Sequence, residues 1–111
     1  MTTGSILLVD DEAKILSALA AALRSEGHEV VATGNAREAQ RLLGQRLFDV
    51  LVVDNLMPEL TGTDLIRELV ASSAPGDRPQ ILMMTAHATV ESAIEAMKLG
   101  ALDYLDRKSV V

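Results

Sequence analysis

The chain of 111 residues has no cysteine and no tryptophan, and it contains only one phenylalanine and one tyrosine. The lack of cysteine excludes disulfide bonds and thiolate metal ligands. The scarcity of aromatic side chains leaves no platform on which nucleic-acid bases could stack. The net charge of -6 also argues against nucleic-acid binding, because neutralising phosphates requires clustered Lys and Arg. These features argue against direct contact with nucleic acid.

Long hydrophobic runs are also missing. No apolar stretch approaches the roughly 20 residues that cross a bilayer, and the N-terminus lacks the basic region and apolar core of a secretory signal. Yet 49% of the residues are hydrophobic, which is more than a disordered segment carries. We therefore expect a single cytoplasmic, globular domain over residues 1–111, with no membrane contact.

Short apolar runs alternate with segments of helical periodicity. The runs predict five strands, over 5–9, 28–33, 49–53, 80–85 and 101–105. The segments between them predict four helices whose apolar faces are Ile15, Leu16, Leu19, Ala22 and Leu23; Ala39, Leu42 and Leu43; Leu65, Ile66, Leu69 and Val70; and Val90, Ala93, Ile94 and Met97. Gly27, Asn35, Thr89 and Gly100 are the expected helix caps. Because parallel strands need crossover connections, the pattern predicts an α/β domain with a parallel sheet covered on both faces.

Polar residues stand where three of these strands end. Asp10 and Asp11 follow the first strand, Asp54 follows the third, and Thr85 ends the fourth. Sites in open parallel sheets form beyond the carboxyl ends of the strands. Carboxylates gathered there repel one another, and a cation with oxygen ligands such as Mg²⁺ would relieve that repulsion. An aspartate beside Mg²⁺ can also act as a nucleophile and form an aspartyl phosphate.

Each of these residues has a simpler explanation when taken alone. A strand-end aspartate often forms a turn or caps a helix, and the acidic pair could cap the first helix. A threonine can simply end a strand. The position of all four at one edge of the expected sheet favours a shared site.

Three motifs then carry a family resemblance: VDDE, VVDNLMPELTG and MMTAHATVESAIEAMKLGALDYL. In order and spacing they resemble the receiver domain of bacterial two-component response regulators. The last motif is most similar to receivers attached to σ54-dependent transcription activators. The resemblance covers essentially the whole chain, and it implies a flavodoxin-like sheet with the strand order 2-1-3-4-5.

The resemblance also implies roles for single residues. Asp54 becomes the phosphoacceptor, Asp11 a direct Mg²⁺ ligand, and Asp10 an acidic residue that acts mainly through water. The backbone carbonyl of Leu56 would complete the protein's share of the metal shell. Pro58 and Gly62 would shape the loop that returns to the next helix.

The switch residues implied by the resemblance are Thr85, whose hydroxyl would move toward the phosphoryl group, and Tyr104, which would rotate inward behind it. The segment that follows this tyrosine departs from the family pattern. Receivers usually continue after DYL with any residue and then Lys-Pro, whereas this chain reads DYLDRKSVV. Arg107 holds the place of the lysine and Lys108 that of the proline, and which of the two supplies the positive charge stays open. A guanidinium does not replace an ammonium isosterically.

The implied partners are a sensor histidine kinase, which would donate the phosphoryl group, and an output domain or partner protein. The output could be an ATPase with a DNA-binding domain, as in transcription activators. The chain ends where the family places a fifth helix. We expect this to expose apolar surface beside the first helix and to favour a homodimer.

Rival interpretations come from other classes. A pseudo-receiver would keep the fold without a phosphate switch, and Arg107 and the absent helix favour it. An Mg²⁺-dependent phosphohydrolase would place a second acid two residues after the nucleophile, where this chain has Leu56. Neither of the glycine-rich nucleotide-binding motifs GxxxxGK[ST] and GxGxxG occurs. A flavin site would need aromatic side chains and a phosphate-binding loop after the first strand. We therefore expect a phosphoacceptor domain that is not a turnover enzyme.

Overall fold

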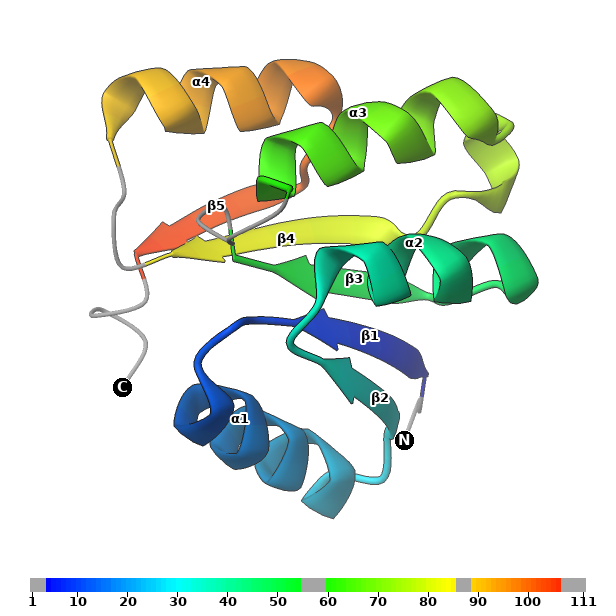
Figure 1. Ribbon diagram of the computed structural model, residues 1–111, viewed down its shortest axis with the longest axis vertical. Coiled ribbons are helices and arrows are strands. Elements are labelled where there is room, and N and C mark those ends of the chain that lie inside the picture. Colours follow the sequence, from blue (N-terminus) through cyan, green and yellow to red (C-terminus); the bar gives the residue numbers. More distant parts are fainter. Residues whose placement is uncertain (1–3, 55–59, 86–88, 107–111) are drawn as a thin grey trace.

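The computed structural model describes residues 4–54, 60–85 and 89–106, and these form a parallel sheet flanked by helices. The sheet has five strands in the order β2-β1-β3-β4-β5 (Figure 1). Its elements follow one another as β1 (Ser5–Val9), α1 (Ala13–Ser25), β2 (Glu29–Thr33), α2 (Ala36–Gln45), β3 (Val50–Val53), α3 (Gly62–Ser72), the 3-10 helix η1 (Pro75–Asp77), β4 (Gln80–Thr85), α4 (Val90–Leu99) and β5 (Asp103–Asp106). The predicted doubly wound α/β architecture is confirmed.

The strand register aligns the carboxyl ends of the central strands. Val9 lies opposite Val53 across β1 and β3, and Val53 lies opposite Met83 across β3 and β4. The hydrogen bonding continues past the strands, since the Asp54 amide donates to the Val9 carbonyl oxygen at 3.0 Å. The residues that follow these strands therefore gather at one edge of the sheet.

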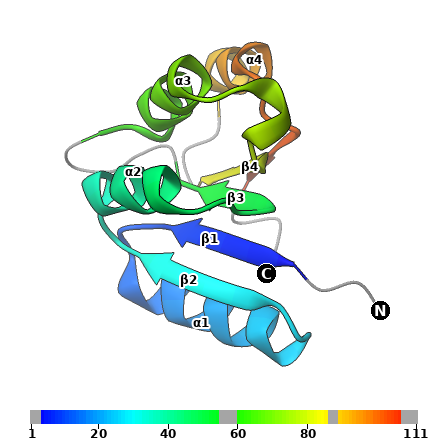
Figure 2. The same ribbon diagram turned by 90° about the vertical axis from the view of Figure 1, so that its right-hand side faces the viewer.

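One face of the sheet carries most of the core. Helices α2, α3 and α4 cover this face, as Figures 1 and 2 show from two directions. Alternate strand residues such as Leu7, Leu51 and Met83 are fully buried beneath the helices, as period-2 strand geometry requires. The predicted faces of α2 and α3 are confirmed, with Ala39 and Ile66 completely buried.

The opposite face of the sheet carries a smaller buried cluster. Among the described elements only α1 packs on this face, over that cluster, which includes Ile6 and Leu8 (Figure 2). Leu82 and Met84 of β4 lie on this face and are half-buried. The predicted face of α1 is wrong at Ala22, which is exposed, while Ala20 is its fully buried residue.

The predicted apolar face of α4 is wrong at its three large residues, although its fourth member, Ala93, is half-buried. Val90, Ile94 and Met97 are 75%, 49% and 48% exposed, whereas Ala96 is completely buried in the same cluster as Met83. Hydrophobic periodicity gives weight to large side chains, but the small alanine lets the helix approach the sheet closely. The larger residues on the other side of α4 consequently lie in solvent.

The end of α4 also shifts the start of the fifth strand. Gly100 has a φ of 111°, a conformation that glycine adopts without strain, and it ends the helix as predicted. The Ala101 amide then donates to the Ala96 carbonyl oxygen at 3.0 Å. That amide belongs to the helix cap, so β5 begins at Asp103 instead of at Ala101.

Candidate functional site

Three carboxylates come together at the carboxyl edge of the sheet. Asp10, Asp11 and Asp54 each offer a carboxylate oxygen, and these oxygens all lie within 4.8 Å of one another. Asp10 and Asp54 are both 4% exposed, and Asp11 is open to solvent. Two buried acids with an accessible third form a cluster that a small ion can reach from one side.

Backbone contacts fix the position of Asp10. Its amide donates to the Thr33 carbonyl oxygen of β2 at 3.2 Å, so it extends the β1–β2 ladder by one residue. Its side-chain oxygen Oδ1 accepts a hydrogen bond from the Glu12 amide at 2.9 Å. This short turn leads directly into α1 and presents Asp11 between the two anchored residues.

Asp54 and Thr85 end neighbouring strands. Asp54 follows β3, and its amide is tied to Val9 of β1. Thr85 is the last residue of β4 and is completely buried. Its backbone lies opposite Asp106 of β5. A buried carboxylate and a buried hydroxyl thus end adjacent strands, as the sequence predicted for a common edge.

The other predicted site residues are described only in part. Tyr104 lies in β5, with its backbone opposite Met83, and nothing further is described of its side chain. Leu56, Arg107 and Lys108 lie outside the described residues. Their predicted roles stay predictions.

Sequence reasoning missed one residue beside this cluster. Gly34 follows β2, and a Cβ atom added to it would lie 3.3 Å from the carbonyl oxygen of Asp10. A glycine directly after a strand was the signal that could have drawn attention to it, because such a residue often marks a close backbone approach.

The donor set fits a hard divalent cation. All three side chains offer oxygen atoms, and protein-bound Mg²⁺ usually takes one or two carboxylates and keeps several waters, so not every carboxylate of the cluster needs to bind the ion directly. The cluster can therefore hold such an ion next to a buried aspartate that is itself a potential nucleophile.

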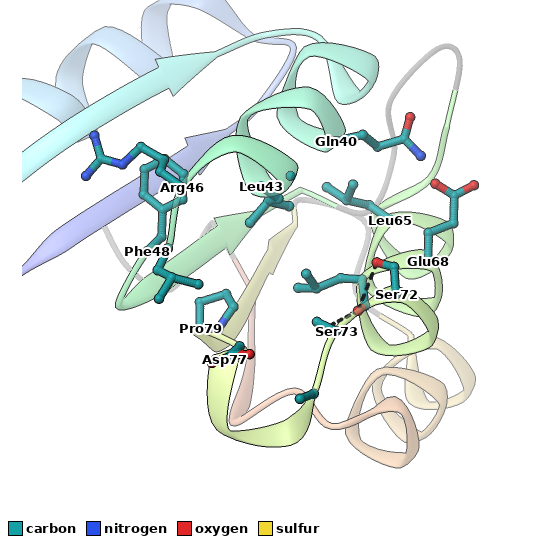
Figure 3. Close-up of a pocket in the computed structure, with 14 residues that line it drawn as sticks. Gln40, Leu43, Arg46, Phe48, Leu65, Glu68, Ser72, Ser73, Asp77 and Pro79 are labelled. Atoms are coloured by element: carbon teal, nitrogen blue, oxygen red, sulfur yellow. Dashed lines mark hydrogen bonds between the residues drawn. The ribbon is translucent and has the colours of Figure 1, made fainter.

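A separate cavity of about 520 Å³ lies at the opposite edge of the sheet. Figure 3 shows its lining, where Phe48 and Pro79 precede β3 and β4 and Leu65 comes from α3. The Arg46 guanidinium stacks 4.5 Å from the centre of the Phe48 ring. None of the acidic residues of the cluster lines this cavity, so the two features are distinct.

No helix in the described ranges has both the length and the apolar character needed to cross a membrane.

Curated relatives are transcriptional regulatory proteins. The chain is 38% identical over 102 residues to the alginate biosynthesis transcriptional regulatory protein AlgB of Pseudomonas aeruginosa, covering 92% of this chain. It is 37% identical over 100 residues to the transcriptional regulatory protein ZraR of Escherichia coli, covering 90% of this chain. In both cases the match spans only 22% of the relative's length.

Solved structures share the fold. The chemotaxis protein CheY4 of Vibrio cholerae superposes with a TM-score of 0.84 at 29% identity, over 94% of this chain and 86% of that one. The beryllofluoride-activated receiver domain dimer of NtrC4 superposes with a TM-score of 0.83 at 34% identity, over 91% of this chain and 81% of that one. The flavodoxin-like receiver fold predicted from the motifs is confirmed.

The response regulator receiver domain family matches residues 6–110, which is nearly the full chain. The resemblance identified from the three motifs is therefore confirmed, and with it the role of a phosphoacceptor signalling domain. The chain belongs to the response regulator receiver domain family.

Proposed function

We propose that Asp54 is the phosphoacceptor of this receiver, and that Asp10 and Asp11 hold Mg²⁺ beside it. The observation that carries the proposal is the gathering of the three carboxylates within 4.8 Å at the carboxyl edge of the sheet. Asp54 is the member that follows the central strand β3 and is nearly enclosed, at 4% exposure. Enclosure suits a nucleophile whose product must be shielded from water.

The transfer is a displacement at phosphorus. A carboxylate oxygen of Asp54 forms the new P–O bond while the P–N bond to the kinase histidine breaks, and the leaving imidazole nitrogen takes a proton from solvent. Bound Mg²⁺ supplies positive charge that offsets the charge on the transferred phosphoryl oxygens. Asp10 keeps its position through Glu12 and Thr33, so this member of the acidic pair is preorganised before transfer.

Thr85 is proposed as the residue that detects the modification. Its place at the end of β4, next to the strand that delivers Asp54, supports a hydroxyl contact with the phosphoryl group. Tyr104 on β5, opposite Met83, would follow that movement. The result is a population shift between two conformations driven by local charge.

We also propose the partners of this domain. A sensor histidine kinase would donate the phosphoryl group in the cytoplasm. An output segment of a longer protein, such as an ATPase with a DNA-binding domain, would respond to it. The curated relatives support an output in transcription, because the chain spans 22% of their length. The dimer of the NtrC4 receiver domain supports a homodimer.

The test is beryllofluoride binding in the presence of Mg²⁺, followed through backbone amide shifts by NMR. Wild-type protein should shift around Asp54, and the shifts should spread to Thr85 and Tyr104. Asp54→Asn should abolish the response. Asp77→Asn is the matched control, because it removes the same charge from an exposed residue of η1 at the other edge of the sheet.

Each outcome separates the candidates. Shifts confined to the acidic cluster would mean that the acceptor works but is uncoupled from Thr85. A folded protein with no Asp54-dependent response would refute the proposal in favour of a pseudo-receiver. Equal loss in Asp77→Asn would show that net charge, and not Asp54, controls binding.

A further inference from the structure

Two loops meet at the acidic cluster, and one of them has no assigned role. The β1–α1 loop contains Asp10 and Asp11, while the β2–α2 loop contains Gly34 and Asn35. An ideal Cβ on Gly34 would lie 3.3 Å from the carbonyl oxygen of Asp10 and 3.8 Å from the Cα atom of Asp11. The first distance is shorter than ordinary van der Waals contact between carbon and oxygen, so the absence of a side chain permits this approach.

The need for glycine here is steric and not conformational. The described glycines with positive φ are Gly27 and Gly100, and Gly34 is not among them. A residue with a side chain could adopt its backbone conformation. Gly34 is also exposed, so a methyl group would meet solvent on its other sides. The carbonyl of Asp10 is the group that a methyl would press against.

Neither loop can move away freely. The backbone amide of Asp10 donates a hydrogen bond to the carbonyl oxygen of Thr33, and the carboxylate of Asp10 accepts one from the amide of Glu12. On the other side, Thr33 lies opposite Val9 in the strand ladder, and Asn35 caps α2. The atoms nearest to an added Cβ are the carbonyl oxygen of Asp10 and the Cα atom of Asp11, so a displacement of a few tenths of an ångström would act on the backbone of this short turn.

We propose that Gly34 is a positioning residue that sets the placement of Asp10 and Asp11 for Mg²⁺, an inference that rests on the proposed function of the cluster. Mg²⁺ requires near-ideal octahedral geometry with ligands at about 2.0–2.1 Å, whereas Ca²⁺ accepts flexible shells at about 2.3–2.6 Å. A methyl group at residue 34 would not touch the ion and would act on the two carboxylates through their backbone. Its effect is comparable to that of outer-shell groups, which orient metal ligands without binding the metal. Gly34→Ala should weaken Mg²⁺ binding about tenfold, at the lower end of such effects. Ca²⁺ binding should weaken less.

The experiment titrates wild type, Gly34→Ala and Gly44→Ala with Mg²⁺ and separately with Ca²⁺, and follows the Glu12 amide by NMR. Glu12 is the reporter because its amide donates to the carboxylate of Asp10. Gly44 is the matched control, since an added Cβ there meets nothing within 4 Å. Gly44→Ala should bind both ions as wild type does.

The loss of Mg²⁺ over Ca²⁺ selectivity in Gly34→Ala alone would support the inference. An unchanged Mg²⁺ midpoint, or an equal loss for both ions, would overturn it while leaving the proposed function intact. If wild type shows no Mg²⁺-dependent shift at Glu12, the proposed function fails as well. Wild type provides a second measurement that needs no variant: the Gly34 amide should shift with the same Mg²⁺ midpoint as Glu12, and a Gly34 amide that does not respond would also overturn the inference.

Discussion

Replacing Asn35 with alanine should destabilise the domain by removing the N-cap of α2. The side-chain oxygen of Asn35 accepts hydrogen bonds from the amides of Arg37 at 2.8 Å and Glu38 at 3.1 Å. Asn35 has the extended backbone of an N-cap, with φ -125° and ψ 120°. Replacing such a cap by alanine costs about 0.5–2 kcal/mol, and two bonded amides place the expected loss near 1–1.5 kcal/mol.

The expected loss can be measured by urea unfolding in EDTA, so that bound metal does not contribute. The urea midpoint of Asn35→Ala should fall with an unchanged m value. For a domain of this size the melting temperature should drop by about 5 °C. Asn35→Ser is the control, because its hydroxyl still accepts from the same amides and should retain most of the stability.

Two results would refute this reasoning. Asn35→Ala could unfold at the wild-type urea concentration, which would mean that water satisfies the two amides equally well. Asn35→Ser could lose as much as Asn35→Ala, which would assign the effect to some other contact of the asparagine.

Three further substitutions test the packing and charge of the fold. Leu51→Ala, at a completely buried position of β3, should lower the free energy of unfolding by about 2–5 kcal/mol in urea. Gly44→Ala in α2 should raise it by about 0.5 kcal/mol, because its Cβ meets no atom; a decrease would contradict the open space at this position. Arg67 pairs with Asp64 and Glu95 at 2.9 Å, and all three side chains are about half exposed. Arg67→Ala should therefore lower the free energy of unfolding by less than about 1 kcal/mol. In thermal unfolding at high salt, the melting temperatures of the variant and the wild type should be the same, because salt screens these ion pairs.

Much of the fold follows from local patterns in the sequence. The apolar runs predicted β1 without error, and Asn35, Gly27 and Gly100 marked helix ends that the structure confirms. These features depend on the chemistry of a few neighbouring residues. The predicted edge carrying Asp54 and Thr85 was also recoverable, because the carboxyl ends of parallel strands meet on one side.

The parts that the sequence did not predict depend on contacts between distant elements. Ala96, and not Ile94, enters the core because the approach of α4 to the sheet favours a small side chain. Periodicity ranks these residues by hydrophobicity and contains no information on that distance. The glycine after β2 could have indicated a close backbone approach, but its neighbour Asp10 lies in a loop separated from it by all of α1 and β2, so no local pattern could identify that partner.

The unequal covering of the two faces of the sheet has a consequence for hydrogen exchange. Helix α1 packs alone on its face among the described elements, over the smaller of the two buried clusters. Its amides should exchange through partial opening, at a lower free energy than those of β1 and β3. The helix starts three residues after Asp10, so this opening would release one wall of the acidic cluster. An ion bound by Asp10, Asp11 and Asp54 would connect the start of α1 to the end of the central strand β3, and the amides of α1 should then exchange more slowly.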